Sequence, residues 1–250
     1  MYFHEMTYDI DILARQNLHI HTTFSGCAKA EMTVDSIIDT AVNAGLEMIA
    51  LTDHFNTDNT NEQCIERNLL LRQQAEQKGG NLKILFSNEL SCYGIGKTLE
   101  NDKVRQAMDY NLYTCNHYHL DYWEQPEDKS ARGYAVHTHK MISSIIKSGF
   151  ADCIAHPIMA GYVRTLKDDV GALSRAMTDN ELGSLLELAA ANEVAFEINI
   201  GAVGNDPELA KRMWALGKEI GTYFNFGTDA HRLENIDTRA LATLAKKLFE

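Results

Sequence analysis

The amino-acid sequence predicts an α/β fold of the TIM-barrel type, with seven parallel strands instead of eight. Three observations support this prediction. Short apolar runs alternate, for the most part, with segments of helical periodicity. The runs are apolar along most of their length rather than at every second position, which is typical of parallel strands covered by helices. Histidine, aspartate or glutamate follows nearly every run, and functional residues of such barrels lie at that end of the strands.

The individual elements follow from apolar runs and from helix end signals. The predicted strands cover residues 18–21, 48–51, 82–86, 112–115, 152–155, 194–198 and 222–226. The predicted helices cover residues 34–44, 61–77, 101–108, 134–147, a segment after 178, 207–220 and a last segment from 237. Their end signals include an N-cap at Thr33, a capping box at Thr178 and Glu181, and glycines at 45, 149 and 221.

The composition favours one domain that spans residues 1–250, because the chain has three prolines and no low-complexity tract. A net charge of −12 argues against long nucleic acid as the main partner. Five scattered cysteines without a CxxC pair favour reduced thiols and a cytoplasmic location. No signal peptide is expected in residues 1–11, and no apolar run reaches the ~20 residues of a membrane span. The oligomeric state stays open.

His19 and His21 stand two positions apart on the first predicted strand. Alternate residues of a strand point to the same face, so the two imidazoles project together and can bind one metal ion. Each histidine alone could equally be a hydrogen-bonded residue on a loop. Further candidates follow other strands, namely Asp53, His54, Glu89, His117, His156, Asp229 and His231. Nine such groups at one rim need a cation to neutralise them, and their donors favour Zn, Mn or Fe.

These residues belong to ordered motifs. The motifs are H-I-H at 19–21, T-D-H at 52–54, Glu89, His117, A-H-P at 155–157 and G-T-D-A-H at 227–231. In this order they resemble the motifs of the PHP family, named for polymerase and histidinol phosphatase. The resemblance implies a distorted (β/α)7 barrel, two or three divalent metal ions and the hydrolysis of phosphoesters. The segment 116–123 looks most like the histidinol-phosphatase branch.

The resemblance also implies how the ligands divide. One ion would be held by His19, His21, Glu89 and Asp229, with Glu89 placed to bridge. His54 and His231 would hold a second ion, and His117 and His156 a further one. Asp53 would orient a ligand rather than bind metal.

Five other residues keep more than one interpretation. Some relatives have a histidine or aspartate ligand in the loop where Cys27 stands, so Cys27 is either a thiolate ligand or no ligand. Glu197 and Asn199 resemble a family Glu-x-Asn pair that supports the site, but they could also form a polar plug. His137 and His139 lie on a predicted helix, where surface or substrate-side roles are expected.

The expected reaction is hydrolysis of a small, histidinol-phosphate-like phosphomonoester by a metal-activated hydroxide. The expected catalytic residues are Glu89, Asp229 and His231, with Asp229 or His231 protonating the leaving alkoxide. The expected substrate-binding residues are His119, Arg164 and Arg232, with Lys29 as a further cation near the rim.

Three other functions stay open. The chain could be a nuclease or nucleotide phosphodiesterase of the same family, or a non-catalytic, metal-bound regulatory barrel. An amide hydrolase on a related barrel would usually need a lysine that bridges two metals, and no lysine stands at a predicted strand end.

Overall fold

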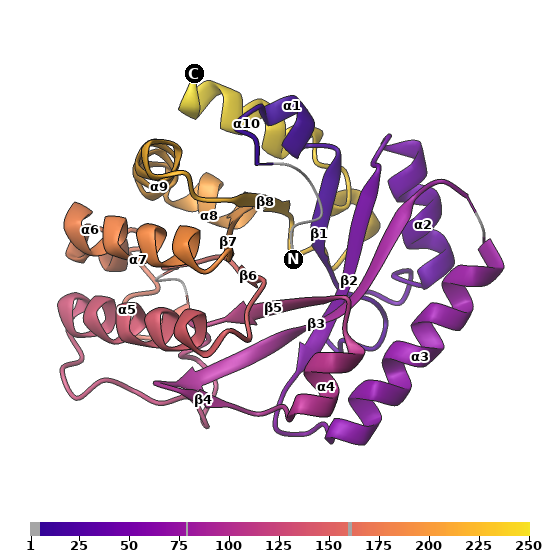
Figure 1. Cartoon of the computed structure of the whole chain (residues 1–250), viewed down its shortest axis with the longest axis horizontal. Coiled ribbons are helices and arrows are strands. Elements are labelled where there is room, and N and C mark those ends of the chain that lie inside the picture. The colour runs from indigo at the N-terminus through magenta and orange to yellow at the C-terminus, as the bar shows by residue number, and fades with distance from the viewer. Residues whose placement is uncertain (1–5, 79, 160–161) are drawn as a thin grey trace.

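Seven parallel strands form the centre of the structure, a computed structural model that describes residues 6–78, 80–159 and 162–250 (Figure 1). In their order of pairing they are β1 (Gln16–Ile20), β2 (Met48–Phe55), β3 (Lys83–Gly94), β5 (Tyr110–Thr114), β6 (Cys153–Ile154), β7 (Ala195–Asn199) and β8 (Phe224–Gly227). After β8 the chain returns to β1, where Ile20 pairs with Ala230 and the His21 amide donates to the Ala230 carbonyl at 2.9 Å. This bridge brings the sheet close to the closed barrel that the sequence predicts.

Helices cover the outside of the barrel (Figure 1). They are α1 (Ile10–Leu13), α2 (Val34–Asn43), α3 (Asn61–Lys78), α4 (Asp102–Ala107), α5 (Ala131–Ser148), α6 (Ala172–Ala176), α7 (Asp179–Ala191), α8 (Ile200–Asn205), α9 (Pro207–Ile220) and α10 (Arg239–Phe249), with a 3-10 turn η2 (Leu233–Asn235). α2 and α3 flank β1 to β3, whereas α5, α6, α7 and α9 lie on the opposite side. α1 packs against α10, so elements from the two ends of the chain are neighbours.

The helix ends carry the predicted signals. The Thr33 hydroxyl accepts the Ser36 amide at the start of α2, and Thr178 and Glu181 form the capping box of α7. Gly149 follows α5 with φ 72°, a left-handed conformation that glycine adopts without steric cost. These contacts join residues three or four positions apart, so the local sequence predicts them well.

β2 and β3 are longer than predicted, and this changes where three site residues stand. The two strands pair continuously, so Asp53, His54 and Glu89 lie within strands rather than after them. The prediction ended each strand at the first polar residue, although a barrel interior can accept polar side chains that contact one another. β4 (Lys97–Thr98), which pairs antiparallel with β3, and the short helices α1 and α8 were also missed.

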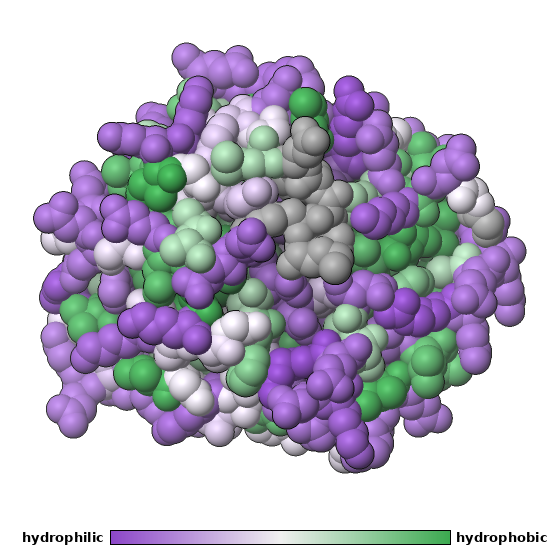
Figure 2. All heavy atoms as spheres, viewed as in Figure 1, coloured by the Kyte–Doolittle hydropathy of each residue, from purple (hydrophilic) through white to green (hydrophobic). Residues whose placement is uncertain are grey.

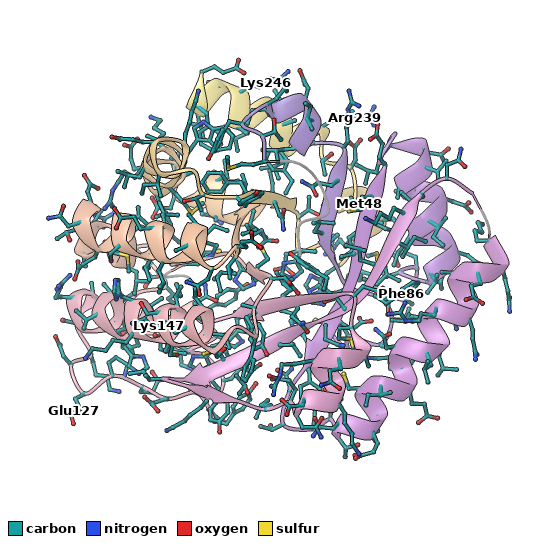
Figure 3. The ribbon with its side chains drawn as sticks, in the orientation of Figure 1. Met48, Phe86, Glu127, Lys147, Arg239 and Lys246 are labelled. Carbon is teal, nitrogen blue, oxygen red and sulfur yellow. The ribbon has the colours of Figure 1, made fainter. Side chains whose placement is uncertain are left out.

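The interior of the barrel changes from apolar to polar along the strands. Six strands contribute to one buried cluster that contains Leu18, Ala50, Leu85, Tyr110, Leu112, Cys153 and Ala195. Leu85 shares its face of β3 with Glu89, and Ala195 shares its face of β7 with Glu197, because side chains alternate along a strand. The apolar cluster is therefore the floor beneath the polar ends of the strands, and side chains fill the space between the ribbons (Figure 3).

The face of the molecule shown in Figure 2 is largely hydrophilic, with separate hydrophobic patches between the charged side chains. Within the described ranges, the structure contains no helix with the length and apolar character that crossing a bilayer requires.

Candidate functional site

The structure brings together all eight residues that were predicted to bind metal. They form three overlapping groups, in each of which the donor atoms lie within 4.8 Å of one another. The groups are His19, His21, Glu89 and Asp229; then His21, His54 and His231; then Glu89, His117 and His156. Residues from both ends of the chain meet here because β1 and β8 are neighbours across the closure of the barrel.

Glu89 is the residue that links these groups. Its side chain is fully buried, and Oε1 lies 2.9 Å from His156 Nε2 and 3.4 Å from His117 Nε2. Oε2 lies 2.7 Å from His54 Nδ1 and 3.7 Å from His19 Nε2. The two oxygens of one carboxylate therefore face two different sets of imidazoles.

The chemistry of the cluster fits divalent metal ions. Glu89 Oε2 and Asp229 Oδ1 are buried and accept no hydrogen bond from a described residue. Asp229 Oδ1 nevertheless lies 2.9 Å from His21 Nε2 and 3.3 Å from His19 Nε2. Buried carboxylate oxygens that lack a donor are costly unless a cation compensates them, and imidazole with carboxylate is a donor set that Zn, Mn and Fe accept.

Two site residues have a strained backbone. His156 has φ 26° and Asp229 has φ 51°, in the region that residues with a side chain seldom adopt. Such strain persists only where the surrounding structure holds it, and it clusters at functional sites. The turns after β6 and β8 therefore point these two side chains back into the cluster.

The electrostatics of the cluster favour metal binding at two of its imidazoles. Burial and the charge of His54 lower the pKa of His21 to about 4, and burial lowers the pKa of His117 to about 3. Both rings are therefore neutral at neutral pH and carry a free lone pair. Burial also acts to lower the pKa of His54, but the charge of Glu89 outweighs it and raises this pKa to about 10. A metal ion at His54 must displace a proton.

Glu197 and Asp53 are two carboxylates that orient histidines of the cluster. Glu197 Oε1 lies 2.8 Å from His19 Nδ1, and Oε2 accepts the His156 amide at 2.5 Å. Asp53 accepts the hydroxyl of Ser25, and the Ser25 oxygen lies 3.1 Å from His21 Nδ1. Both carboxylates thus orient histidines through their Nδ1 side, which is how outer partners tune metal ligands.

A cavity of about 440 Å³ opens above the cluster. His54, His117, Asp229 and His231 form part of its wall, together with Phe24, Ser25, Gly26, Cys27, Asn56, Asp58, Asn59, His119, Leu120 and Tyr162. Asn56, Asp58 and Tyr162 were not singled out in the sequence. For Asn56 and Asp58 the one signal was position, because they come two and four positions after the T-D-H motif, and loops after strands form the mouth of a barrel.

The two arginines predicted to bind substrate lie outside the lining of this cavity. Arg164 is exposed, pairs with Asp121 at 3.2 Å and donates to the His119 carbonyl. Arg232 is exposed and faces a separate depression together with Lys29. Of the predicted substrate contacts, only His119 is part of the described wall.

His137 differs from the surface or substrate-side position expected of it, whereas His139 is partly exposed, in agreement with a surface position. His137 is buried on α5, 3.0 Å from the Tyr118 hydroxyl and 3.0 Å from Glu124 Oε1. His139 lies 3.0 Å from the Ser184 hydroxyl. The expectation for His137 was wrong because the segment before α5 folds over this face of the helix.

Cys27 lies beside the second group of histidines. Its Sγ is 3.0 Å from His231 Nε2. Burial acts to raise the pKa of this thiol, but contacts with His231 and His54 outweigh it and lower the pKa to about 6.

Comparison with known proteins gives one family. The PHP domain model matches residues 17–200. A Vibrio parahaemolyticus protein named a probable phosphatase is 26% identical over 240 residues, which cover 90% of this chain and 81% of that protein. A Thermotoga maritima protein named a probable histidinol-phosphatase is 26% identical over 229 residues, which cover 88% and 85% of the two chains.

A crystal structure of a Listeria monocytogenes protein, provisionally titled a histidinol phosphatase, has the same fold. It superposes with a TM-score of 0.64 at 13% identity and covers 91% of this chain and 99% of that one.

The matched range includes seven of the nine residues at the rim, whereas Asp229 and His231 come after it and join the cluster through the barrel closure. The barrel of seven parallel strands agrees with the same assignment. The chain therefore belongs to the PHP domain family and is a phosphoesterase of that family.

Proposed function

We propose that this chain hydrolyses a small phosphomonoester similar to histidinol phosphate, with two or three divalent ions of Zn, Mn or Fe. The position of Glu89 carries the proposal, because its two oxygens face different sets of imidazoles. A carboxylate can join two cations, whereas an imidazole nitrogen binds one. Cations bound there would lower the pKa of a water molecule towards neutrality and offset the charge of phosphate oxygens.

The protein's own residues must deliver a proton to the leaving alkoxide. Asp229 is poorly suited, because the charge of His19 and contact with His21 outweigh burial and hold its pKa far below the usual range. His119 and His231 both line the cavity. Burial and the charge of Arg164 lower the pKa of His119, whereas contacts with Cys27 and Asp229 outweigh burial and raise the pKa of His231. Imidazole is the side chain that most often donates a proton near neutral pH, so we propose His119 and His231 as the two candidate general acids.

The charge of the cavity wall supports a substrate that carries a positive group beside its phosphate. No lysine or arginine is found among the described residues that line the cavity. Asp58 is the carboxylate of this wall outside the metal cluster, and it forms no ion pair or hydrogen bond with another described residue. A cationic amine or imidazolium group of the substrate would complement it, as histidinol phosphate does.

A nuclease or nucleotide phosphodiesterase is the second candidate. The net charge of −12 and the lack of cationic side chains in the described wall both disfavour a polyanionic substrate. We also propose a reducing, cytoplasmic setting, since all five cysteines are free thiols.

The test is release of inorganic phosphate from histidinol phosphate, p-nitrophenyl phosphate and a nucleoside monophosphate, together with cleavage of a single-stranded oligonucleotide. We expect the highest kcat/KM for histidinol phosphate, and loss of activity with a chelator that Mn²⁺ or Zn²⁺ reverses. Cleavage of the oligonucleotide alone would favour the nuclease. Full metal content without any hydrolysis would favour a regulatory barrel.

A further inference from the structure

The loop that carries Cys27 is held in a defined position between β1 and α2. The Ser25 hydroxyl donates to Asp53, and the Lys29 amide donates to the His231 carbonyl at 3.0 Å. The loop is thus tied to β2 on one side of Cys27 and to the segment after β8 on the other. These contacts place the Cys27 Sγ at 3.0 Å from His231 Nε2, and the thiol also contacts His54.

The hydrogen bonds of His231 show which of its nitrogens is free. Nδ1 lies 2.8 Å from the Asp229 carbonyl oxygen. A carbonyl oxygen can only accept, so Nδ1 carries the proton of the neutral ring and Nε2 holds the lone pair. The ring nitrogen available to a metal ion is therefore the one beside Cys27.

His21 has a single free nitrogen as well, although it belongs to two of the three donor groups. The Ser25 hydroxyl already donates to Asp53, so its oxygen accepts a hydrogen bond from His21 Nδ1–H at 3.1 Å. The remaining nitrogen, Nε2, lies 2.9 Å from Asp229 Oδ1 and 3.1 Å from His19 Nε2. One lone pair serves one cation, so His21 belongs with His19 and Asp229.

This assignment leaves the second group one donor short. Without His21, the protein donors are His54 and His231, and two imidazoles alone rarely hold a divalent ion. Glu89 Oε2, a buried oxygen without a hydrogen-bond donor, lies 2.7 Å from His54 Nδ1 and points to the same place. Cys27, whose Sγ lies 3.0 Å from His231 Nε2, can supply a further ligand at this position.

We propose that Cys27 is a thiolate ligand of the cation held by His54 and His231. This inference rests on the proposed presence of metal at the site, but not on the reaction. Binding releases the thiol proton to solvent. A sulfur ligand selects Zn²⁺, Fe²⁺ or Co²⁺ over Mn²⁺ and Mg²⁺ at this position. In this arrangement His231 binds the metal ion, and His119 is the imidazole that can protonate the leaving group.

Cobalt spectroscopy tests the sulfur–metal bond directly. Wild-type protein loaded with Co²⁺ should show sulfur-to-cobalt charge-transfer absorption in the near ultraviolet. Cys27→Ser should abolish this band and lower the affinity for Zn²⁺ by at least about tenfold, with a much smaller effect on Mn²⁺. Cys64→Ala, which removes a buried thiol on α3, should keep the band. Full Co²⁺ binding without the band, or a band that survives in Cys27→Ser, overturns the proposal.

Thiol alkylation gives a second test that needs no variant. Cys27 is exposed, whereas Cys64, Cys92, Cys115 and Cys153 are buried. Iodoacetamide should therefore modify Cys27 in the metal-free protein, and Zn²⁺ should slow this reaction by at least about tenfold because a bound thiolate is no longer a free nucleophile. Equal rates with and without Zn²⁺ would refute the bond. Neither readout depends on catalysis, so a cobalt band in a protein without phosphatase activity would reject the proposed function and retain this inference.

Discussion

Glu89 is enclosed by imidazoles on both sides of its carboxylate. Burial would raise its pKa, but the charges of His117 and His54 hold that pKa well below the usual range. The side chain is therefore an anion at neutral pH, and its Oε2 accepts no hydrogen bond from a described residue. The surrounding imidazoles interact with the negative charge of this carboxylate.

Glu89→Gln should lower turnover at least ~10²-fold, comparable to the loss of one electrostatic element of a catalytic site. The amide keeps the size of the side chain but replaces one ligand oxygen by an NH2 group, so one metal ion should bind weakly. Turnover and metal content per chain measure this. Glu62→Gln, on the first turn of α3, removes the same charge away from the site and is the control. Near-normal metal content and turnover in a folded Glu89→Gln variant would contradict the bridging role.

Asp58→Asn should raise the KM for histidinol phosphate about two- to fivefold, the range expected for a solvent-exposed ion pair. The KM for p-nitrophenyl phosphate, which has no cationic group, should stay unchanged. Steady-state kinetics on both substrates check the difference, again with Glu62→Gln as the control for net charge. An equal change in KM for both substrates would mean that Asp58 does not interact with the cationic group of the substrate.

At the scale of elements, β7 and β8 are packed so closely at the site that one position admits no side chain. A Cβ on Gly227 would lie 2.0 Å from Glu197 Oε1 and 2.8 Å from His19 Cβ. Glycine is therefore required here by close approach, and the carboxylate that orients His19 depends on it.

Gly227→Ala should push Glu197 away from His19 Nδ1 and weaken metal affinity about 10- to 100-fold, the usual effect of losing an outer partner. Isothermal titration with Zn²⁺ measures this. Gly183→Ala on α7, where an added Cβ would meet nothing within 4 Å, is the matched control and should leave affinity unchanged. Unaltered Zn²⁺ affinity in Gly227→Ala would show that Glu197 does not orient His19.

The contact between α5 and α7 makes stability depend on pH. Arg132 holds Glu181 through two hydrogen bonds of 2.6 and 2.7 Å, and this pairing lowers the pKa of Glu181 to about 2 from 4.5. A carboxyl group whose pKa is lower in the folded state stabilises it above pH 4.5, and that contribution is lost as pH falls towards 2.

Arg132→Met should therefore reduce the loss of unfolding free energy between pH 4.5 and 2. Urea unfolding at several pH values measures the change. Lys147→Met, which removes an exposed charge near the end of the same helix (Figure 3), should leave this acid-dependent loss as in wild type. If Arg132→Met lost as much unfolding free energy between pH 4.5 and 2 as the wild type does, the loss would come from other carboxylates.

At the scale of the whole molecule, the metal cluster sits where the barrel closes. His19 lies on β1 and Asp229 in the turn after β8, and their side chains come within 3.3 Å of each other. A cation bound by both ends of the sheet stabilises the closed state, since the unfolded chain does not present these donors together.

Removal of the metal ions by a chelator should lower the thermal midpoint. A cation present at 100 times its Kd contributes about 2.7 kcal/mol to folded-state stability. Calorimetry of the metal-free and Zn²⁺-loaded protein measures the difference. One cooperative transition in both states would support the proposal that residues 1–250 form one domain. A midpoint that does not respond to metal would mean that the cluster forms without bound ions.

The sequence by itself determined the order of the elements, most helix ends and the histidine and carboxylate motifs. Thr33 and the Thr178–Glu181 box were predictable because capping joins residues three positions apart. The side-chain alternation of strands likewise predicted that His19 and His21 would point together.

Only the tertiary structure decided the lengths of β2 and β3, the burial of His137 and the wall of the cavity. Loop conformations that no motif encodes placed Asp58 in that wall and left Arg164 and Arg232 outside it. The pairing of Cys27 with His231 also needed the closed barrel, because it joins a loop after the first strand to a turn after the last one. Contacts between distant residues depend on how the sheet closes and how loops pack, and the spacing of neighbouring residues determines neither.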